Sequence, residues 1–251
     1  MVKIGLCGFT MAMERYPLHF PVVEVQQTFY EPPSEPLLRR WVAAMPAGFE
    51  FTLKAWQLIT HTSKSPTYRR LKRALSEEER ASCGNFQDSP IVREALKRSL
   101  ACAKLLRASV LVFQCPGSFG PQPENVERLR HFVTHLARPQ CPPGLRLAWE
   151  PRGRAWTEHA DLAVELCREL GLVYVVDPFV DVIRETAGSP YLRLHGVTGA
   201  RHVYTDRELH HLVEVTPPDA YVLFNNIPRV NDAQRFGALL GSLKMGATDV
   251  R

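Results

Sequence analysis

The chain has 251 residues, of which 45% are hydrophobic and 23% are charged, and its formal net charge is +5. This composition is typical of a globular protein that folds alone, and so small a charge does not by itself imply nucleic acid. No stretch approaches the roughly 18 uninterrupted apolar residues of a membrane helix, and the first residues lack the pattern of a signal peptide. We therefore expect a cytoplasmic protein with no membrane partner.

Eight short apolar runs of β character recur along the chain. Several are apolar on consecutive residues, as expected for strands of a parallel sheet that is covered on both faces. The runs are Val2–Cys7, Val22–Thr28, Phe49–Ala55, Val110–Cys115, Leu145–Glu150, Leu172–Asp177, Tyr191–His195 and Tyr221–Asn225.

Amphipathic helical patterns separate most of these runs. Leu162, Leu166 and Leu170, for example, recur at a spacing of four and form one apolar stripe. Thr205 and Glu208 form the sequence pattern of a capping box, which marks a helix start.

Eight strands that alternate with helices favour an α/β fold with a single (β/α)8 barrel, the TIM barrel, over an open doubly wound sheet of five or six strands. We expect one domain over residues 1–251. Its first β/α unit is irregular, because Thr10–Pro21 is too short for a full crossover helix. The last helix is expected from Asp232 to about Leu243, followed by a frayed tail at about residues 244–251.

A long helical excursion is expected after the third run, because residues 56–109 exceed what one barrel unit needs. We place it at about residues 64–88, ahead of a helix that starts after Ser89, and we read residues 68–80 as one charged surface helix. Residues 64–107 contain 11 Lys or Arg and 5 Asp or Glu, an excess of 11 − 5 = 6 positive charges. This segment is either a solvated face or a surface for a phosphate backbone or an acidic partner.

Charged or amide side chains end most of the apolar runs. In a barrel the carboxyl ends of all strands meet at one mouth, so these residues become neighbours. A buried ring of charges costs several kcal/mol unless it is paired, so we expect the ring to be used or to be balanced internally. Its members are Glu24, Gln26 and Thr28 on one face of the second run, Lys54, Gln114, Glu150 with Arg152, Asp177, Arg193 with His195, and Asn225 with Asn226.

The mixture of signs in this ring indicates the chemistry. A carboxylate among cations stays ionised, so Glu150 or Asp177 is predicted to be a general base, with His195 as the proton donor. Glu24 is the fourth catalytic candidate. The predicted substrate-binding residues, which would hold a polar or anionic ligand, are Lys54, Gln26, Gln114, Arg152, Arg193, Asn225, Asn226, Tyr30 and His61.

Cofactor motifs are absent from the sequence. It contains no P-loop, no GxGxxG and no Ser/His/Asp order, so nucleotide-cofactor chemistry is not expected and no cofactor is predicted. A divalent metal is a second hypothesis, because Glu24, Glu150, Asp177 and His195 are acceptable ligands. Lys54 would compete with the metal for the same carboxylates.

The six cysteines include no CxxC pair, which argues against zinc-ribbon and thioredoxin folds. We expect reduced thiols that serve as packing residues. Cys7 is the exception, because it ends the first run and is expected at the site.

The strand ends resemble those of the YecE-like family, also called domain of unknown function 72, over about residues 4–243. The resemblance implies a TIM barrel with its site at these strand ends, and no established reaction comes with it. It rests on Val23-Glu24-Val25-Gln26, Thr28-Phe29-Tyr30, Phe51–Lys54, Thr60-His61, Phe113-Gln114 with Pro116, Ser118 and Phe119, Glu150, Arg152, Trp156, Asp177, Tyr191–Gly196, Tyr204 and Phe224-Asn225-Asn226.

The chain also departs from the family pattern. Cys7-Gly8-Phe9 stands where the family usually reads Ser-Gly-Trp, and Gln26 stands where an Asn is usual. A usual His and Ser are missing between Glu150 and Trp156. These changes indicate a divergent branch with an altered pocket.

Three functions remain open from the sequence. The first is an enzyme of hydrolase or isomerase type that acts on a small polar or phosphorylated compound, with Arg152, Arg193 and Lys54 stabilising negative charge. The second is a metal-dependent enzyme at the same mouth. The third is a binding module in which the basic excursion contacts nucleic acid and the ring only holds the barrel closed.

Overall fold

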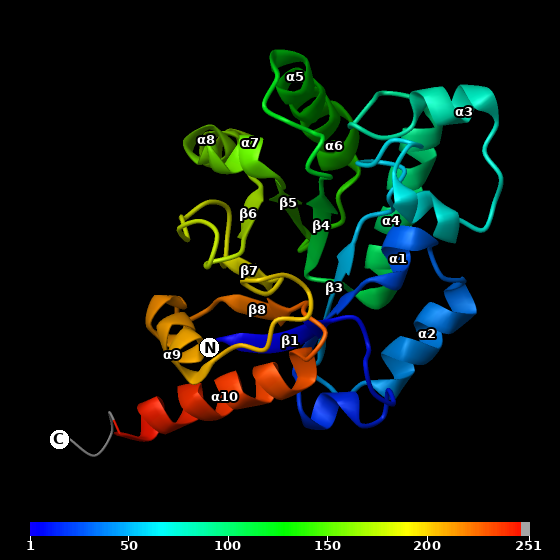
Figure 1. Cartoon of the computed structure of the whole chain (residues 1–251). Helices are drawn as coiled ribbons and strands as arrows, with labels where there is room; N and C mark the ends of the chain where they lie inside the picture. Colours follow the sequence, from blue (N-terminus) through cyan, green and yellow to red (C-terminus); the bar gives the residue numbers. More distant parts are fainter. Residues whose placement is uncertain (247–251) are drawn as a thin grey trace.

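The computed structural model describes residues 1–246, with the backbone alone for residues 243–246. Eight parallel strands follow one another around a closed barrel, in which β8 pairs with β1 (Figure 1). The predicted TIM-barrel fold is therefore confirmed. The strands are β1 (Lys3–Cys7), β2 (Val22–Val25), β3 (Glu50–Lys54), β4 (Val110–Gln114), β5 (Arg146–Glu150), β6 (Val173–Val176), β7 (Tyr191–Leu194) and β8 (Tyr221–Phe224).

Helices cover the outside of the barrel, and α10 lies across β1 and β8 in Figure 1. Within the described residues, no helix combines the length and the apolar character that crossing a membrane requires. The helices, with the 3-10 turns η1 and η2 and the π-helical stretch η3, are η1 (Tyr16–Leu18), α1 (Gln27–Tyr30), α2 (Glu35–Ala44), η2 (Pro66–Arg70), α3 (Glu77–Ser82), α4 (Pro90–Leu106), α5 (Pro123–His131), η3 (Phe132–Ala137), α6 (Arg138–Gln140), α7 (Arg154–Thr157), α8 (Ala160–Leu170), α9 (Asp206–Val215) and α10 (Arg229–Gly246).

Alternate residues of each strand point into the barrel, as the two-residue period of a strand requires. Inside it, Val110, Val112, Val173 and Val175 belong to a small apolar cluster that is separate from the larger core between strands and helices. At the carboxyl ends of the strands, the side chains that point inward are mostly polar. The mouth of the barrel is therefore polar, whereas its middle is mainly apolar.

The first β/α unit is irregular, as predicted, and contains only η1. Tyr16 of this turn is fully buried, and its hydroxyl accepts a hydrogen bond from the Leu6 amide at 3.0 Å. The same hydroxyl donates to the Val22 carbonyl oxygen at 3.0 Å. One side chain thus links β1 to β2 in place of a packed crossover helix.

The excursion after β3 is present, but the single helix predicted over residues 68–80 is wrong. Leu71 and Ser76 have extended backbone, with ψ of 128° and 167°, so the chain makes η2 and then restarts as α3. Ser76 explains the restart, because its hydroxyl accepts from the Glu79 amide at 3.1 Å in a capping box. The local start signal overrides the helical spacing of the apolar residues.

Two predicted boundaries also differ from the structure. Strand β2 ends at Val25, three residues before the predicted end, because Thr28 turns back to donate its hydroxyl to the Lys54 carbonyl oxygen at 2.7 Å. Helix α10 continues to Gly246, past the predicted end at Leu243. The rest of the predicted frayed tail, residues 247–251, lies outside the described residues.

The close approach of β1 to β2 generates a prediction at Gly5. A Cβ atom there would lie 2.2 Å from the Val22 carbonyl oxygen, and this backbone atom cannot move without breaking the pairing of the strands. We expect Gly5→Ala to lower the free energy of unfolding by about 1–3 kcal/mol, measured by urea unfolding. The control is Gly241→Ala in α10, where a Cβ atom would meet no described atom beyond its own helix backbone within 4 Å and stability should be unchanged or higher. Equal stability of Gly5→Ala and wild type would contradict this prediction.

Candidate active site

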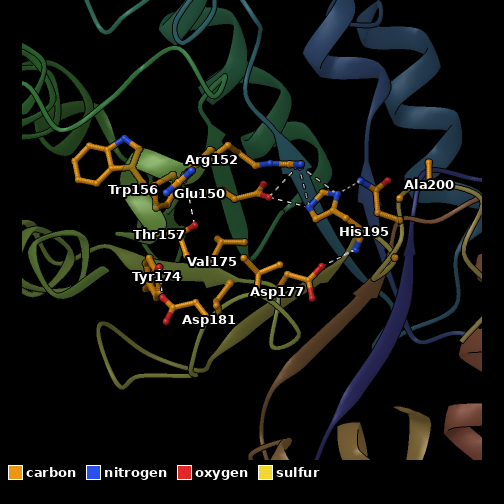
Figure 2. Close-up of a pocket in the computed structure, with 18 residues that line it drawn as sticks. Glu150, Arg152, Trp156, Thr157, Tyr174, Val175, Asp177, Asp181, His195 and Ala200 are labelled. Atoms are coloured by element: carbon orange, nitrogen blue, oxygen red, sulfur yellow. Dashed lines mark hydrogen bonds and ion pairs between the residues drawn. The ribbon is translucent and has the colours of Figure 1, made fainter. Parts of the chain in front are cut away.

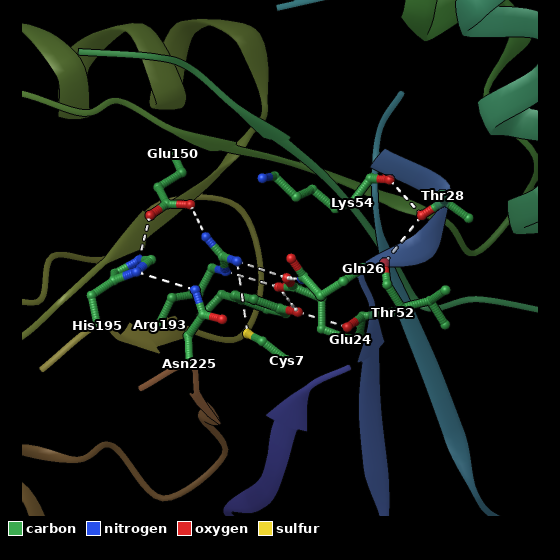
Figure 3. A network of polar contacts seen from close by, with 12 residues as sticks. Cys7, Glu24, Gln26, Thr28, Thr52, Lys54, Glu150, Arg193, His195 and Asn225 are labelled. Carbon is green, nitrogen blue, oxygen red and sulfur yellow. Dashed lines mark hydrogen bonds and ion pairs between the residues drawn. The ribbon is translucent and has the colours of Figure 1, made fainter. Parts of the chain in front are cut away.

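The centre of the barrel mouth is Arg193, whose side chain is 1% exposed. Its Nε and Nη2 atoms donate to the two carboxylate oxygens of Glu24 at 3.0 and 2.9 Å, and its Nη1 donates to Glu150 (Figure 3). Burial acts to lower the pKa of Arg193, but Glu150 and Glu24 together raise it well above its ordinary value. One guanidinium thus pairs with two buried carboxylates and links β2, β5 and β7.

Glu24 is completely enclosed. Besides the bonds from Arg193, its carboxylate accepts a hydrogen bond from the Tyr191 hydroxyl at 2.9 Å and another from the Gln26 amide. The Tyr191 hydroxyl lies 2.6 Å from the hydroxyl of Thr52, which continues the network into the barrel. Since Glu24 is 0% exposed and its oxygens are engaged, its position suits a structural counter-ion rather than a group that contacts substrate.

Glu150 connects this closed network to the open side of the mouth. Its Oε2 binds Arg193, while its Oε1 lies 2.9 Å from Nε2 of His195 and 3.6 Å from Nη1 of Arg152. Burial alone would raise the pKa of Glu150, but the cationic groups of Arg193 and His195 hold it well below its usual range. Glu150 therefore remains a carboxylate that fixes His195.

His195 is held on every side by polar groups. If Nε2 carries the proton toward Glu150, Nδ1 is an acceptor, and the Asn225 amide nitrogen lies 3.2 Å from it. The guanidinium of Arg152 lies 3.2 and 3.3 Å from the two ring nitrogens. Asp177 holds the backbone, because its Oδ2 accepts the His195 amide proton at 2.9 Å.

The pKa of Asp177 is shifted in the opposite direction to that of Glu150. Burial raises the pKa of its carboxyl above the ordinary value, although its oxygens also accept the backbone amides of His195 and Phe179. Two carboxylates on neighbouring strands therefore differ in acidity, which is the arrangement that separates acid and base roles in enzymes.

Lys54 ends β3 with its Nζ 3.4 Å from the centre of the Phe29 ring. Within the described range 1–246, this ammonium makes no hydrogen bond or ion pair, and the residue is 7% exposed. Burial, with a smaller effect of Arg193, lowers its pKa to about 7. Lys54 is thus a cation that titrates near neutral pH at the mouth.

Two hollows flank Asn225 at this mouth. The first has a volume of about 510 Å³ and lies over β5, β6 and β7 (Figure 2), and the second has a volume of about 460 Å³ and lies over β1 and β2. Residues lining the first include Glu150, Arg152, Trp156, Asp177, Asp181 and His195. Residues lining the second include Cys7, Gln26, Tyr30, Arg70, Asn225 and Arg229.

Most predicted site residues are brought together around these hollows. Gln114 ends β4 in register with Glu150, but within the described residues no hydrogen bond links its side chain to the group. His61 is buried against the edge of Phe29, and burial lowers its pKa to about 3, so it is neutral. The residues that meet are Glu24, Gln26, Lys54, Glu150, Arg152, Asp177, Arg193, His195 and Asn225, with Tyr30 at the second hollow.

Asn226 lies apart from the site. Its amide nitrogen donates to the His202 carbonyl oxygen at 2.9 Å and to Asp232 at 2.6 Å, outside the barrel. Asn225 and Asn226 follow β8 as neighbours, and successive residues point in opposite directions, so only one of them reaches the mouth. The prediction that both bind substrate is not supported for Asn226 by this placement.

The sequence analysis missed Tyr191 and Thr52, which complete the shell around Glu24. A signal was present, because Tyr191 lies two residues before Arg193 and Thr52 lies two residues before Lys54, so each shares the inward face. Arg229 was also missed, and it follows a strand end by five residues, where strand period gives no information.

The predicted metal-ligand set does not form a metal site. In the part of the chain that the structure describes, no three His, Cys, Asp or Glu side chains lie where they could hold one ion. The physical reason is that Arg193 already binds both Glu24 and Glu150.

The six cysteines are free thiols, and Cys7 lies at the mouth as expected. Its sulfur is 3.7 Å from Nη2 of Arg193. Burial raises the pKa of the Cys7 thiol, with a smaller contribution from Glu24, so it is protonated at neutral pH and is a poor nucleophile.

The chain is similar to several known proteins. The family model described as "Protein of unknown function DUF72" matches residues 9–249, whereas none of the curated proteins matches the chain. A DUF72 protein from Enterococcus faecalis V583 is 20% identical over 96% of both chains, with a TM-score of 0.71. A DUF72 protein from Thermotoga maritima MSB8 is 22% identical over 96% of this chain and 99% of that one, with a TM-score of 0.68.

A more distant solved structure is a D-tagatose 3-epimerase-like protein. It is 15% identical to this chain and covers 99% of this chain and 100% of its own, with a TM-score of 0.58. At such identities the similarity shows the shared barrel fold alone.

The Arg193 network generates a stability prediction. Arg193→Leu should lower the free energy of unfolding by about 3–5 kcal/mol, because Glu24 and Glu150 would stay buried without their cation. Urea unfolding followed by circular dichroism measures the loss. The double variant Arg193→Leu/Glu150→Gln should lose less than the sum of its single variants, since one uncompensated charge is gone. Strictly additive losses would show that the two residues are not coupled.

Lys54 generates a prediction on pH. Its pKa is about 7 in the folded protein and near 10.5 in an unfolded chain, so between these values the unfolded chain binds the extra proton. Stability should therefore rise with pH in this window, and wild type should gain about 1.4 kcal/mol per pH unit relative to Lys54→Met. Urea unfolding between about pH 7.5 and 9 measures the difference. The control Lys97→Met removes an exposed lysine, and its stability should depend on pH as that of wild type does. If the difference in stability between wild type and Lys54→Met does not change with pH, the prediction is contradicted.

Proposed function

The chain belongs to the DUF72 family, as its strand ends predict, and we propose that it is an enzyme that transfers protons on a small polar substrate in the first hollow. The observation that carries the proposal is the contact of His195 with the buried Glu150 carboxylate at the wall of this hollow. A carboxylate behind an imidazole fixes the orientation and the tautomer of the ring. The reaction is of isomerase or hydrolase type.

His195 has the role of general acid and base. Because Nε2 faces Glu150, the proton is exchanged at Nδ1, which lies 3.2 Å from the Asn225 amide nitrogen. A substrate hydroxyl that takes the place of this amide would lie within hydrogen-bond distance of Nδ1. General acid–base groups of this kind contribute about 10²- to 10⁴-fold to a rate.

Asp177 is the stronger candidate for the second proton-transferring group. It lines the first hollow, and burial raises its pKa, so it holds a proton more strongly than Glu150 does. Glu150, which the sequence also favoured as a base, is a weak base because Arg193 and His195 hold its pKa low. Asp177 and His195 together supply a base and an acid within one hollow.

Arg152 supplies the positive charge that the reaction needs. Its side chain is 38% exposed, and its guanidinium lies beside His195 in Figure 2, where it can stabilise negative charge that develops on a substrate oxygen. A compound with a carbonyl group flanked by hydroxyl groups fits this set, since proton transfer at carbon and oxygen would isomerise it. The name of the D-tagatose 3-epimerase-like neighbour agrees with this choice of substrate class.

A nucleic-acid surface on the excursion is the less favoured function. Two arginines of the basic segment 64–107 already pair with carboxylates: Arg73 with Glu79 at 2.9 Å and Arg93 with Asp88 at 2.6 Å. Its outward charge is therefore smaller than its composition suggests, whereas the hollow collects titratable groups at one point. Nucleic-acid binding remains a prediction, with steep salt dependence as its signature.

The test is a screen of aldoses, ketoses and their phosphates for protein stabilisation and for deuterium uptake from D2O. Wild type should be stabilised by a ligand and should catalyse solvent exchange at the carbon beside its carbonyl group. His195→Gln and Asp177→Asn should each lower the exchange rate by about 10²-fold or more while the ligand still binds.

The matched control is His210→Gln, which replaces an exposed histidine on α9 and should leave the rate unchanged. A hydrolase would instead release a product without exchange, and the same two variants should abolish that release. If no compound is exchanged or hydrolysed at a rate that depends on His195 and Asp177, the proposal fails.

A further inference from the structure

We propose that the second hollow is an anion-binding subsite, in which Arg70 and Arg229 hold a phosphate group of a ligand that reaches His195 through Asn225. The part of the proposal that links the two hollows rests on the proposed function. The subsite itself rests on the charges and contacts of the second hollow alone.

The first argument is the sign of the lining residues. The second hollow is lined by two arginines and, within residues 1–246, by no carboxylate, although it lies at a mouth where acidic residues are common. The first hollow is different, because three carboxylates (Glu150, Asp177 and Asp181) line it beside two arginines (Arg152 and Arg154). Two hollows of one mouth thus differ in charge, and the second suits the anionic part of a ligand.

The guanidinium of Arg70 is stacked on an aromatic ring, and its N–H groups are free of partners among the described residues. The centre of its guanidinium lies 3.6 Å from the centre of the Tyr30 ring, so the cation rests on the aromatic face. In the described part of the chain, Arg70 forms no ion pair and no side-chain hydrogen bond. Stacking fixes the plane of the guanidinium and leaves its N–H groups available for bidentate contact with a phosphate.

Arg229 comes from a distant part of the sequence, since it is the first residue of α10. Its Nη1 donates to the Asn226 carbonyl oxygen at 3.1 Å, and Asn226 is itself held by Asp232. Its Nε is buried and has no acceptor among the described residues. Arg229 is therefore anchored and, among the described residues, has no carboxylate partner, so its charge at the wall of the hollow is available to an anion.

Asn225 joins the two hollows, because it lines both of them. Its amide nitrogen contacts Nδ1 of His195 on the side of the first hollow. On the other side, Gln26 adds a second amide to the lining of the second hollow. Each hollow, at about 460 and 510 Å³, is large enough for part of a small ligand. The substrate class is thus a phosphorylated polyhydroxyl compound, with phosphate at the arginines and the reacting carbons at His195.

The experiment measures binding of inorganic phosphate by calorimetry at low ionic strength, in wild type, Arg70→Leu and Arg229→Met. Each substitution should weaken phosphate binding by about 10-fold or more, as expected for loss of a charge-assisted contact. Arg69→Leu is the matched control, because Arg69 is exposed on the same turn and does not line the hollow, and it should bind as wild type does. Arg70 is exposed too, so its variant is expected to fold.

The outcomes separate this inference from the proposed function. Phosphate binding that is equal in wild type and both arginine variants, or that falls equally in Arg69→Leu, overturns the subsite. His195→Gln should keep the phosphate affinity of wild type, so a failure of catalysis alone leaves the subsite intact. A sugar phosphate should bind at least 10-fold more tightly than the same sugar without phosphate, and only when both arginines are present; equal affinities overturn the link between the hollows.

Discussion

A buried arginine shared by two carboxylates is the interaction on which the mouth of this barrel depends. Arg193 lies between Glu24 and Glu150, all three are almost fully buried, and the contacts tie β7 to β2 and β5. Such a triad is a poor way to gain stability, because well-packed apolar side chains of similar volume often hold a core as well or better. Its value lies in what it positions: Arg193 and His195 bind opposite oxygens of Glu150, so the triad fixes the imidazole at the edge of an open hollow.

The same interaction separates the ionisation of neighbouring groups. Arg193 contributes to the low pKa of Glu150 and also to the depressed pKa of Lys54, while Asp177, four strands away from Glu24 across the mouth, has its pKa raised by burial. The pKa values of three titratable groups at one mouth are therefore shifted in different directions by one cation and by differences in burial. This separation is what acid–base chemistry at neutral pH requires, and a solvated surface of the same composition would not produce it.

The sequence predicts the barrel and much of its mouth because both follow from the period of a strand. His195 directly follows β7 and lies two residues after Arg193, and Asn225 continues the inward row of β8, so the direction of these side chains could be predicted without coordinates. The reasoning fails two or three residues beyond the strands: Thr28 turns back to the Lys54 carbonyl oxygen, and Asn226 points to Asp232. Nor could the pairing of Glu24 with Arg193 be predicted, since it depends on how the eight strands are staggered when the barrel closes.

The excursion after β3 illustrates a different limit of sequence reasoning. Its charge and spacing indicate a solvated helix, yet the extended residues Leu71 and Ser76 break that helix, and Arg70 ends up on Tyr30 at the second hollow. A basic residue read as surface thus becomes part of the wall of the mouth, because a loop brings it there and an aromatic ring holds it. Arg229 reaches the same hollow from α10, and among the described residues no carboxylate lines that hollow. In the proposed subsite a ligand neutralises this positive charge, while the paired charges around Arg193 orient the reacting groups.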